Sequence, residues 1–274
     1  MRMPWPTKHF EIARFGREKI YECFAIDSSH GYLWISRLNM VTKFFERLDV
    51  YHDFTPRSAA LNMAIDEALL EVATIPSIRF YGWHSPALSF GYFGRFADVG
   101  DYAAGRDLVR RWTGGGIVFH GDDLTYSIVI PAGDPVFGES SMSIYEKIHS
   151  ALRNALATNG GGVELAAMGR NAALRRPRTA QRAVPTNICF ANPVEADVII
   201  GARKVAGAAQ RRTRAGLLQQ GSIQNVDVEN DFAERFAQAL STNCSERTMN
   251  KEILNRARAL ADQKYATQGW LRKR

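Results

Sequence analysis

The sequence contains few cysteines and no closely spaced metal ligands. Its three cysteines, Cys23, Cys189 and Cys244, lie far apart among 274 residues, and no Cys-x-x-Cys occurs. No two of the six histidines stand at metal-ligand spacing. These absences argue against a zinc site and against a disulfide framework, so we expect no bound metal. Each single cysteine remains a candidate nucleophile.

The chain also lacks a long apolar run. No stretch approaches the roughly 20 apolar residues that span a bilayer. Residues 1–24 carry charges throughout and have no uninterrupted apolar core of the signal-peptide kind. We therefore expect a cytoplasmic protein that does not bind a membrane. The composition, 46% hydrophobic and 23% charged, is ordinary for a globular protein with a sizeable core.

Acidic residues are too few to balance the basic ones, which leaves a net charge of +7 and a pI of about 9.4. This charge suits a nucleic acid, an anionic membrane surface or an acidic protein partner. Much of the excess lies in two stretches, residues 170–182 with five arginines and residues 203–214 with five basic residues. Each stretch could be a docking surface or a solvated loop.

Hydrophobic periodicity predicts an α+β fold. Thr55-Pro56 has the pattern of a helix start, and apolar residues from Leu61 to Val72 repeat at helical spacing, with Asp66 and Glu67 off that stripe. Further helices are expected over 144–156, 232–240 and 253–260, and strands over 77–83, 87–92, 124–131, 163–167 and within 194–224. This order lacks a regular strand–helix alternation, so we expect a mainly antiparallel sheet flanked by helices.

We divide the chain into three parts. Residues 1–49 show no clear periodicity and are treated as an amino-terminal extension; a later methionine, Met40, makes a misassigned start a possible explanation. Residues 50–242 hold the motifs and form the expected catalytic domain. Residues 243–274 are expected to form a helical tail. No linker or internal repeat separates these parts.

The densest motif is Arg110-Arg111-Trp112-Thr113-Gly114-Gly115-Gly116-Ile117-Val118-Phe119-His120. Glycines without a Cβ let backbone N–H groups approach a ligand, and the arginines could neutralise a carboxylate or phosphate. The motif is neither a P-loop nor a dinucleotide fingerprint. A triple glycine by itself is more often a tight turn, and a single histidine such as His120 is more often a hydrogen-bonded strand residue than a catalyst.

Two further segments could carry chemistry. Lys204 begins a run whose small residues Gly207 and Ala208 leave room for a bound chain, although an exposed hairpin lysine is the simpler interpretation. Cys189 lies in a loop before this run. A buried cysteine is usually inert, but a cation such as Lys204 could lower its pKa and make it a nucleophile.

These segments together resemble the lipoate–protein ligase A and cysteine-dependent octanoyltransferase family, in the biotin/lipoate protein ligase superfamily. Residues 62–69 look like its opening helix, and residues 110–120 are similar to its Arg-Arg-x-(Thr/Ser)-Gly-Gly-Gly-x-Val-x-His motif. Residues 204–210 resemble its lysine motif and residues 220–223 its His-Gly-(Ser/Thr)-Ile element. The resemblance covers roughly residues 50–225 and rests on several long motifs in the same order.

The resemblance implies a biotin/lipoate protein ligase-like catalytic domain with a narrow apolar channel for an acyl chain. It assigns catalysis to Lys204 and Cys189. It assigns acyl or adenylate binding to the following residues: Arg111, Thr113, Gly114, Gly115, Gly116, His120, Gly207 and Ala208. The enzyme would acylate a lysine of a lipoyl domain or of the glycine-cleavage H protein, as a monomer. It would hold no tightly bound cofactor, with lipoate or octanoate as substrate.

Two chemistries fit this family. Octanoyltransferases take the acyl group from acyl carrier protein onto a cysteine, whereas ligases form an acyl-adenylate with ATP and magnesium. Cys189-Phe190-x-x-Pro193 resembles the transferase motif, which favours transfer slightly. Two departures concern substrate choice: Gln220 stands where histidine is frequent, and Asp197 follows Cys189 in place of the usual tyrosine–glutamate pair.

Two interpretations lie outside this activity. The basic stretches could belong to a nucleic-acid-binding module, but the chain lacks the interleaved aromatic and basic residues of a base-stacking surface. We therefore expect no nucleic acid partner. A member of the same fold could also bind an acyl group without catalysis.

Overall fold

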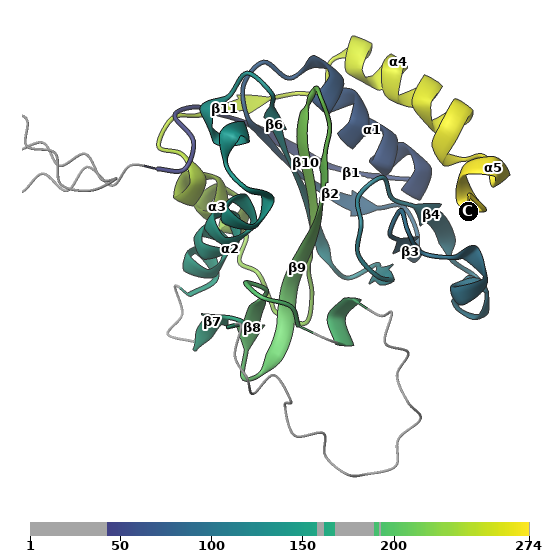
Figure 1. Cartoon of the computed structure of the whole chain (residues 1–274), viewed down its shortest axis with the longest axis horizontal. Helices are drawn as coiled ribbons and strands as arrows, with labels where there is room; N and C mark the ends of the chain where they lie inside the picture. The colour runs from purple at the N-terminus through teal and green to yellow at the C-terminus, as the bar shows by residue number, and fades with distance from the viewer. Residues whose placement is uncertain (1–42, 158–161, 168–188, 192, 274) are drawn as a thin grey trace, which may run out of the picture. The chain divides into compact units, whose positions relative to one another are not determined.

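A computed structural model describes residues 43–157, 162–167, 189–191 and 193–273 (Figure 1). Residues 1–42 of the expected extension 1–49 lie outside these residues, and so does the arginine-rich stretch 170–182. The part from Lys43 onward forms one structural unit. Its elements follow one another as strands and helices in irregular order, so the α+β class expected from the sequence is confirmed.

An eight-stranded sheet forms the centre of this unit, in the strand order β11-β1-β2-β6-β10-β9-β8-β7. β1 pairs in parallel with β2 and β11, and every other neighbouring pair is antiparallel. The strands are β1 Leu48–Arg57, β2 Ser77–Trp83, β6 Leu124–Pro131, β7 Val163–Leu165, β8 Val198–Ile200, β9 Arg203–Arg212, β10 Gly216–Ile223 and β11 Cys244–Arg247. The mainly antiparallel sheet is therefore as expected.

A second, three-stranded sheet contains the two ends of the glycine motif. Its order is β4-β3-β5, with bounds β3 Ala87–Phe90, β4 Asp107–Arg110 and β5 Val118–His120. The glycines at 114–116 form the connection from β4 to β5. This connection therefore leaves one strand of the small sheet and returns to another, which positions its backbone beside the large sheet.

Helices cover both faces of the large sheet. On one face α2 (Ser141–Leu156) and α3 (Phe232–Leu240) share an apolar core with β1, β2, β6, β9 and β10. On the other face α1 (Ala59–Val72) and α4 (Lys251–Leu260) pack with parts of β2, β6 and β10. Figure 1 shows α2 and α3 on one side of the strands and α1 and α4 on the other.

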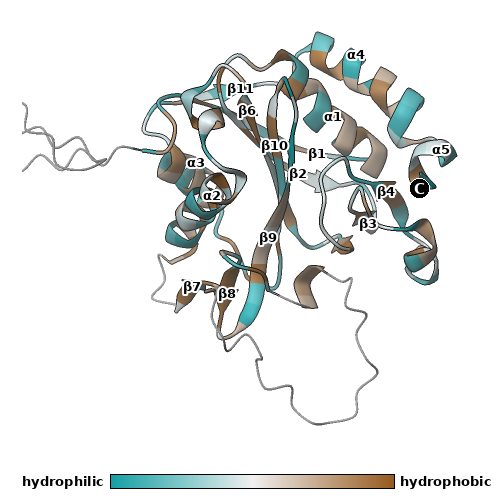
Figure 2. Ribbon diagram, in the orientation of Figure 1, coloured by the Kyte–Doolittle hydropathy of each residue, from teal (hydrophilic) through white to brown (hydrophobic). Residues whose placement is uncertain are grey.

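Alternation along β6 explains this two-sided packing. Tyr126, Ile128 and Ile130 belong to the core under α2 and α3, whereas Val129 belongs to the core under α1. Successive strand side chains point to opposite faces, so an apolar run such as 128–130 is buried on both sides. Figure 2 shows hydrophobic residues in brown and hydrophilic residues in teal following one another along the helices that flank the sheet.

The start of α1 differs from the expectation. β1 continues to Arg57, with a register shift between Asp53 and Arg57, and the helix starts at Ala59. Ser58, not Thr55, caps it: the Ser58 hydroxyl accepts from the Leu61 N–H at 3.3 Å. Pro56 is accommodated within the irregular end of the strand, where a ladder donor is dispensable.

The interpretation that Asp66 and Glu67 lie off the buried face of α1 is wrong. Both carboxylates are buried, Asp66 completely. Arg79 donates to Asp66 at 2.8 Å, and Lys264 donates to Glu67 at 2.6 Å. Because α1 is enclosed by a sheet on one side and by the carboxy-terminal segment on the other, its polar side chains need internal partners.

The carboxy-terminal segment is helical after its first strand. β11 adds an edge strand to the large sheet, and α4 is continued by a π-helical turn, Ala261–Tyr265, and by α5, Gln268–Leu271. The division at residues 242 and 243 stays a prediction, although strand pairing joins this segment to β1. In the described part of the chain, no helix is long and apolar enough to cross a membrane.

Candidate functional site

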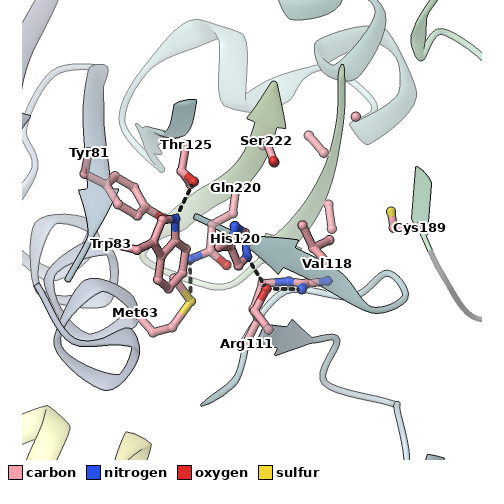
Figure 3. A pocket seen from close by; sticks show the side chains of 15 residues that line it. Met63, Tyr81, Trp83, Arg111, Val118, His120, Thr125, Cys189, Gln220 and Ser222 are labelled. Carbon is pink, nitrogen blue, oxygen red and sulfur yellow. Dashed lines mark hydrogen bonds between the residues drawn. The ribbon is translucent and has the colours of Figure 1, made fainter. Parts of the chain in front are cut away.

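A narrow pocket opens between the two sheets, beside α1 (Figure 3). It encloses about 380 Å³ of empty space, part of it open to solvent. Its apolar wall consists of Met63, Tyr81, Trp83, Val118, Ala208 and Ala209. Its polar wall consists of Ser89, Arg111, His120, Thr125, Gln220 and Ser222, and it also touches Cys189, Gly207 and Gly221. Figure 3 shows Cys189 on the side away from Trp83, with Arg111 and His120 between them.

Arg111 holds the glycine connection in shape. One guanidinium nitrogen donates to the Ser89 hydroxyl at 2.6 Å, and the other donates to the carbonyls of Gly114 at 3.0 Å and Gly116 at 2.9 Å. Gly115 has φ +86°, which favours glycine. The Arg111 guanidinium therefore stabilises the conformation of the glycine loop, and Arg111 also lines the pocket.

Gly91 allows this loop to come close. A Cβ at Gly91 would lie 2.0 Å from the Gly115 carbonyl oxygen, so any larger residue would push the loop away. The Tyr92 N–H in turn donates to the Thr113 carbonyl at 2.8 Å. The close approach was not anticipated from the sequence, because Gly91 lies 24 positions before Gly115 and outside the motif.

The structure brings together only part of the predicted binding set. Arg111, His120, Gly207 and Ala208 line the pocket. Thr113 is buried beside it and donates to the Gln220 side chain at 2.8 Å. Gly115 and Gly116 line a different, open hollow that also includes Phe90, Gly91 and Phe93.

The neighbouring Arg110 faces away from the pocket. Its guanidinium donates to the carbonyls of Tyr92, Gly94, Trp270, Leu271 and Lys273 at 2.7–3.3 Å. The Trp270 indole N–H donates back to the Arg110 carbonyl at 2.9 Å. Since adjacent strand residues point to opposite sides, Arg110 fixes the carboxy-terminal segment while Arg111 serves the pocket.

His120 is held as a neutral ring in a buried hydrogen-bond chain. Its Nδ1 lies 2.8 Å from an Asp123 carboxylate oxygen, and its Nε2 lies 2.7 Å from the Ser89 hydroxyl. Burial lowers the pKa of His120, against the opposing effect of Asp123. A carboxylate can only accept, so Nδ1 carries the hydrogen and Nε2 accepts from Ser89.

Asp123 gathers the polar groups at this end of the pocket. Burial alone would raise its pKa, but hydrogen bonds from His120, Ser222 and the Gly121 N–H hold that pKa below its usual value. Thr125 also donates to Asp123 at 2.9 Å and accepts from the Trp83 indole at 2.8 Å. The His120 and Trp83 rings stack with centroids 3.9 Å apart. These hydrogen-bonded and stacked side chains form one wall of the pocket.

Lys204 and Cys189 meet at the opposite end. The Lys204 ammonium lies 3.7 Å from the Cys189 sulfur and donates to the Cys189 carbonyl at 3.1 Å. Its third partner is Asp197, at 2.8 Å, and both of these side chains are buried. The Cys189 N–H donates to the Ile117 carbonyl at 2.9 Å, which ties this cysteine to the end of the glycine motif.

A second cation lies near the same sulfur. Burial lowers the pKa of Arg111, and the charge of the nearby Cys189 opposes that shift. Cys189 is partly buried, in the short 3-10 turn Cys189–Ala191. A thiol between an ammonium and a guanidinium is in the electropositive, partly exposed environment typical of reactive cysteines.

A β-bulge aims Lys204 at the site. Opposite β8, Val198 pairs with Ala206 and Ile199 with Lys204, so Val205 is an extra residue in β9. Val205 and Ala206 both pack into the core under α2 and α3, which leaves Lys204 on the same side of β9 as Gly207, a residue that lines the pocket. A Cβ at Gly207 would lie 2.3 Å from the Lys204 Cε, so only glycine leaves room for this lysine.

Sequence reasoning missed several members of the site. Ser89 and Trp83 line the pocket from elements that carry no recognisable motif, and Met63 lines it from the opening helix, where it was not singled out. Asp197 was noted only as a departure from a pattern, yet it pairs with Lys204. Gln220, the other departure, lines the pocket and donates to Asp66 at 2.7 Å. A carboxylate seven positions before a buried lysine was the only sequence signal for the ion pair.

Comparison with known proteins identifies relatives of most of the described unit. A family model described as the lipoyl protein ligase A/B catalytic domain matches residues 58–265. This range contains every element that lines the pocket.

Curated relatives are named octanoyltransferase LipM. The protein from Macrococcus caseolyticus is 36% identical over 185 residues, which is 62% of this chain and 64% of that protein. The protein from Oceanobacillus iheyensis is 37% identical over 184 residues, 64% of this chain and 63% of that protein. The aligned region thus spans less than two thirds of the length of these relatives.

Solved structures share the fold. The lipoate protein ligase of a bipartite system from Thermoplasma acidophilum, studied with its E2 lipoyl domain, superposes with a TM-score of 0.60. It is 22% identical, and the match covers 83% of this chain and 96% of that one. The predicted biotin/lipoate protein ligase-like architecture is confirmed.

Proposed function

Since the chain belongs to the lipoyl protein ligase A/B catalytic domain family, we propose that it transfers an octanoyl group to a lysine of a lipoyl-domain protein. The transfer passes through a thioester on Cys189. The observation that carries this proposal is the Cys189 sulfur, 3.7 Å from the Lys204 ammonium and at one end of an apolar pocket. The names of the octanoyltransferase relatives support the same activity.

The first step forms the thioester. The Cys189 thiolate attacks the carbonyl carbon of an octanoyl thioester carried by acyl carrier protein, and the bond to the carrier sulfur breaks. The departing carrier thiolate takes up the proton that Cys189 gave up. The carbonyl oxygen becomes negative during attack, and a preorganised cation beside the sulfur stabilises that charge. The Lys204 ammonium, 3.7 Å from the sulfur, supports this role, and the Arg111 charge lies near the same cysteine.

The second step passes the acyl group on. A neutral amine of the acceptor lysine attacks the thioester carbonyl, the bond to the Cys189 sulfur breaks, and the amine releases a proton to solvent. The thiolate is a good leaving group, especially between two cations. The same Lys204 ammonium stabilises the oxyanion of this step, because both steps use one carbonyl position.

The pocket supplies the place for the acyl chain. Met63, Trp83 and Val118 form apolar walls of the pocket, and neutral His120 adds no charge there. An apolar chain that enters this space leaves water behind, which favours binding by about 0.8 kcal/mol for each buried CH₂. The narrow shape favours an unbranched chain. Octanoyl and lipoyl groups both meet this description, and we favour octanoyl because of the thioester route.

The acceptor belongs to the proposal as well. The archaeal ligase of the same fold was studied with an E2 lipoyl domain, and an acceptor of this type, or an H protein, fits the transfer to lysine. An acidic acceptor would be attracted by the net charge of +7. The arginine-rich stretch 170–182 stays a candidate docking surface for such an acceptor, with a solvated loop as the alternative.

The decisive experiment mixes the enzyme with octanoyl-acyl carrier protein in the absence of acceptor. We expect one octanoyl mass on the enzyme, mapped to Cys189 and released by neutral hydroxylamine, and no adduct on Cys189→Ala. The matched control is Cys244→Ala, since Cys244 is exposed and outside the pocket.

Adenylation offers the opposite result. A ligase needs no cysteine, consumes ATP with free lipoate and ignores acyl carrier protein. ATP-dependent lipoylation that survives Cys189→Ala would refute the transferase proposal and establish the ligase.

A further inference from the structure

Asp197 is the most completely enclosed charge next to the reactive pair. Its side chain has no solvent exposure and accepts three hydrogen bonds. The donors are the Lys204 ammonium at 2.8 Å, the Tyr145 hydroxyl at 2.6 Å and the Val194 N–H at 2.6 Å. Asp197 does not line the pocket. Of its hydrogen-bond partners, Lys204 is the one that also contacts Cys189, so a role of Asp197 in the reaction passes through Lys204.

We infer that Asp197 is a positioning residue, which keeps the Lys204 side chain directed at Cys189. This inference rests on the proposed function for its link to acyl transfer. An ammonium has three hydrogens. Asp197 takes one of them, which leaves two directed to the carbonyl and sulfur of Cys189.

The ammonium needs this carboxylate because it is itself buried. The Lys204 side chain is 2% exposed. A charge removed from water without a counter-ion is unfavourable, so a lysine without Asp197 would swing toward solvent. The cation would then no longer lie 3.7 Å from the Cys189 sulfur.

The chain accepts backbone strain to place this carboxylate. Ala196, just before Asp197, has φ +63°, a left-handed conformation that is uncommon for a residue with a Cβ. Asp197 closes the same turn through both its N–H, which donates to the Val194 carbonyl at 3.1 Å, and its side chain, which accepts from Val194. The turn thus fixes the position of the carboxylate through contacts that do not involve Lys204.

Tyr145 links the same carboxylate to the pocket wall. Its hydroxyl donates to Asp197 and accepts from the Ala208 N–H at 3.1 Å. Ala208 lines the pocket. One side chain from α2 therefore fixes both the counter-ion and the strand beside the acyl site, so Asp197 and the wall of the pocket keep a constant separation.

The test is a double-mutant cycle on the rate of thioester formation at Cys189. Asp197→Asn should lower that rate tenfold or more while the KM for octanoyl-acyl carrier protein stays within twofold. Lys204→Gln should lower it further. Because Asp197 acts only through Lys204, the double variant should be no slower than Lys204→Gln alone. Rate losses that multiply in the double variant would overturn the inference.

Asp53→Asn is the matched control. Asp53 is also a buried carboxylate paired with an arginine, Arg79, but it lies outside the pocket. We expect this variant to unfold more easily and to retain its rate of thioester formation, measured well below the unfolding temperature. Equal rate losses in Asp53→Asn and Asp197→Asn would mean that Asp197 is merely structural.

A second readout does not depend on the acyl donor. In a Cys23→Ser, Cys244→Ser background, iodoacetamide reports the reactivity of Cys189 alone. Asp197→Asn should slow alkylation at pH 7 at least threefold, and should change nothing when Lys204→Gln is already present. Alkylation at the parent rate would refute the positioning role. If the parent forms no thioester but alkylation follows this pattern, the proposed function fails and the inference stands.

Discussion

Two buried ion networks in this protein use similar groups for different purposes. In the first, under α1, Arg79 donates all five of its N–H groups: to Asp53 twice, to Asp66 once and to Asn62 twice, at 2.8–3.1 Å. In the second, beside the pocket, Lys204 has one strong carboxylate partner and a long contact to the Cys189 sulfur. The first network is closed, and the second has an opening toward the pocket.

The difference shows how a buried charge becomes available for chemistry. In a closed network every donor binds an acceptor of the fold, so the Arg79 network stabilises the packing of β1, β2 and α1. An open network keeps one donor aimed at a group that changes during reaction. We therefore expect damage to the Arg79 network to appear mainly as lost stability, and damage to the Lys204 network mainly as lost activity.

The largest effect should come from Arg79→Ala. Removal of one partner from a buried ion pair leaves charged groups without compensation and typically costs about 3–5 kcal/mol. Asp53 and Asp66 would be left in this condition, although Arg57 still pairs with Asp53. Urea denaturation measures the loss. The control is Arg256→Ala, which breaks the exposed pair with Glu71 and should leave the unfolding free energy nearly unchanged.

Lys204→Gln should cost about a hundredfold in the rate of acyl transfer, equivalent to about 2.7 kcal/mol. Glutamine keeps a donor for Asp197 but lacks the charge that stabilises the oxyanion. Single-turnover acylation of a lipoyl domain measures the loss, with Lys147→Gln, an exposed lysine on α2, as the control. A rate within threefold of the parent would show that the Lys204 network, like the Arg79 network, serves only the fold.

A smaller effect is expected at acid pH. It involves His149, which lies near Asp197. Burial lowers the pKa of His149 from 6.5 to about 4. The unfolded chain binds the proton more readily than the folded protein, so this contribution is complete above pH 6.5 and is lost as pH falls toward 4. We expect a loss of about 2 kcal/mol in unfolding free energy over two pH units.

His149→Gln should flatten this part of the stability curve, because the group that titrates is gone. The control His84→Gln removes an exposed histidine and should leave the curve unchanged. Stability measured by denaturation from pH 7 to pH 4.5 decides the matter. Parallel curves for the parent and His149→Gln would assign the acid sensitivity to other groups.

The smallest effect is expected from Gly207→Ala. The new methyl group would lie 2.5 Å from the Lys204 ammonium nitrogen, and the flexible end of the lysine must move. We expect a loss of about tenfold in rate, close to 1.4 kcal/mol, with little change in stability. Gly82→Ala is the control, since a Cβ there meets no atom within 4 Å. Equal rates in the two variants would mean that the position of Lys204 is not critical.

Much of the fold could be predicted because its signals are local. The alternation in β6 and the helical spacing of α2 are properties of neighbouring residues, and both elements formed where expected. Thr55 misled for the same reason: its pattern is that of a cap, but pairing between β1 and β2 continues to Arg57. A long-range ladder thus outweighed a local preference.

The sequence alone determined the glycine motif, its place before His120, and a lysine and a cysteine that could react. Tertiary structure decided which side chains meet. Arg110 and Arg111 are neighbours with the same chemistry, yet one binds the carboxy-terminal segment and the other the pocket. A bulge at Val205 turned Lys204 toward Cys189, and a turn at Ala196 supplied its counter-ion. Such pairings depend on faces and registers set by distant strands, which residue spacing does not encode.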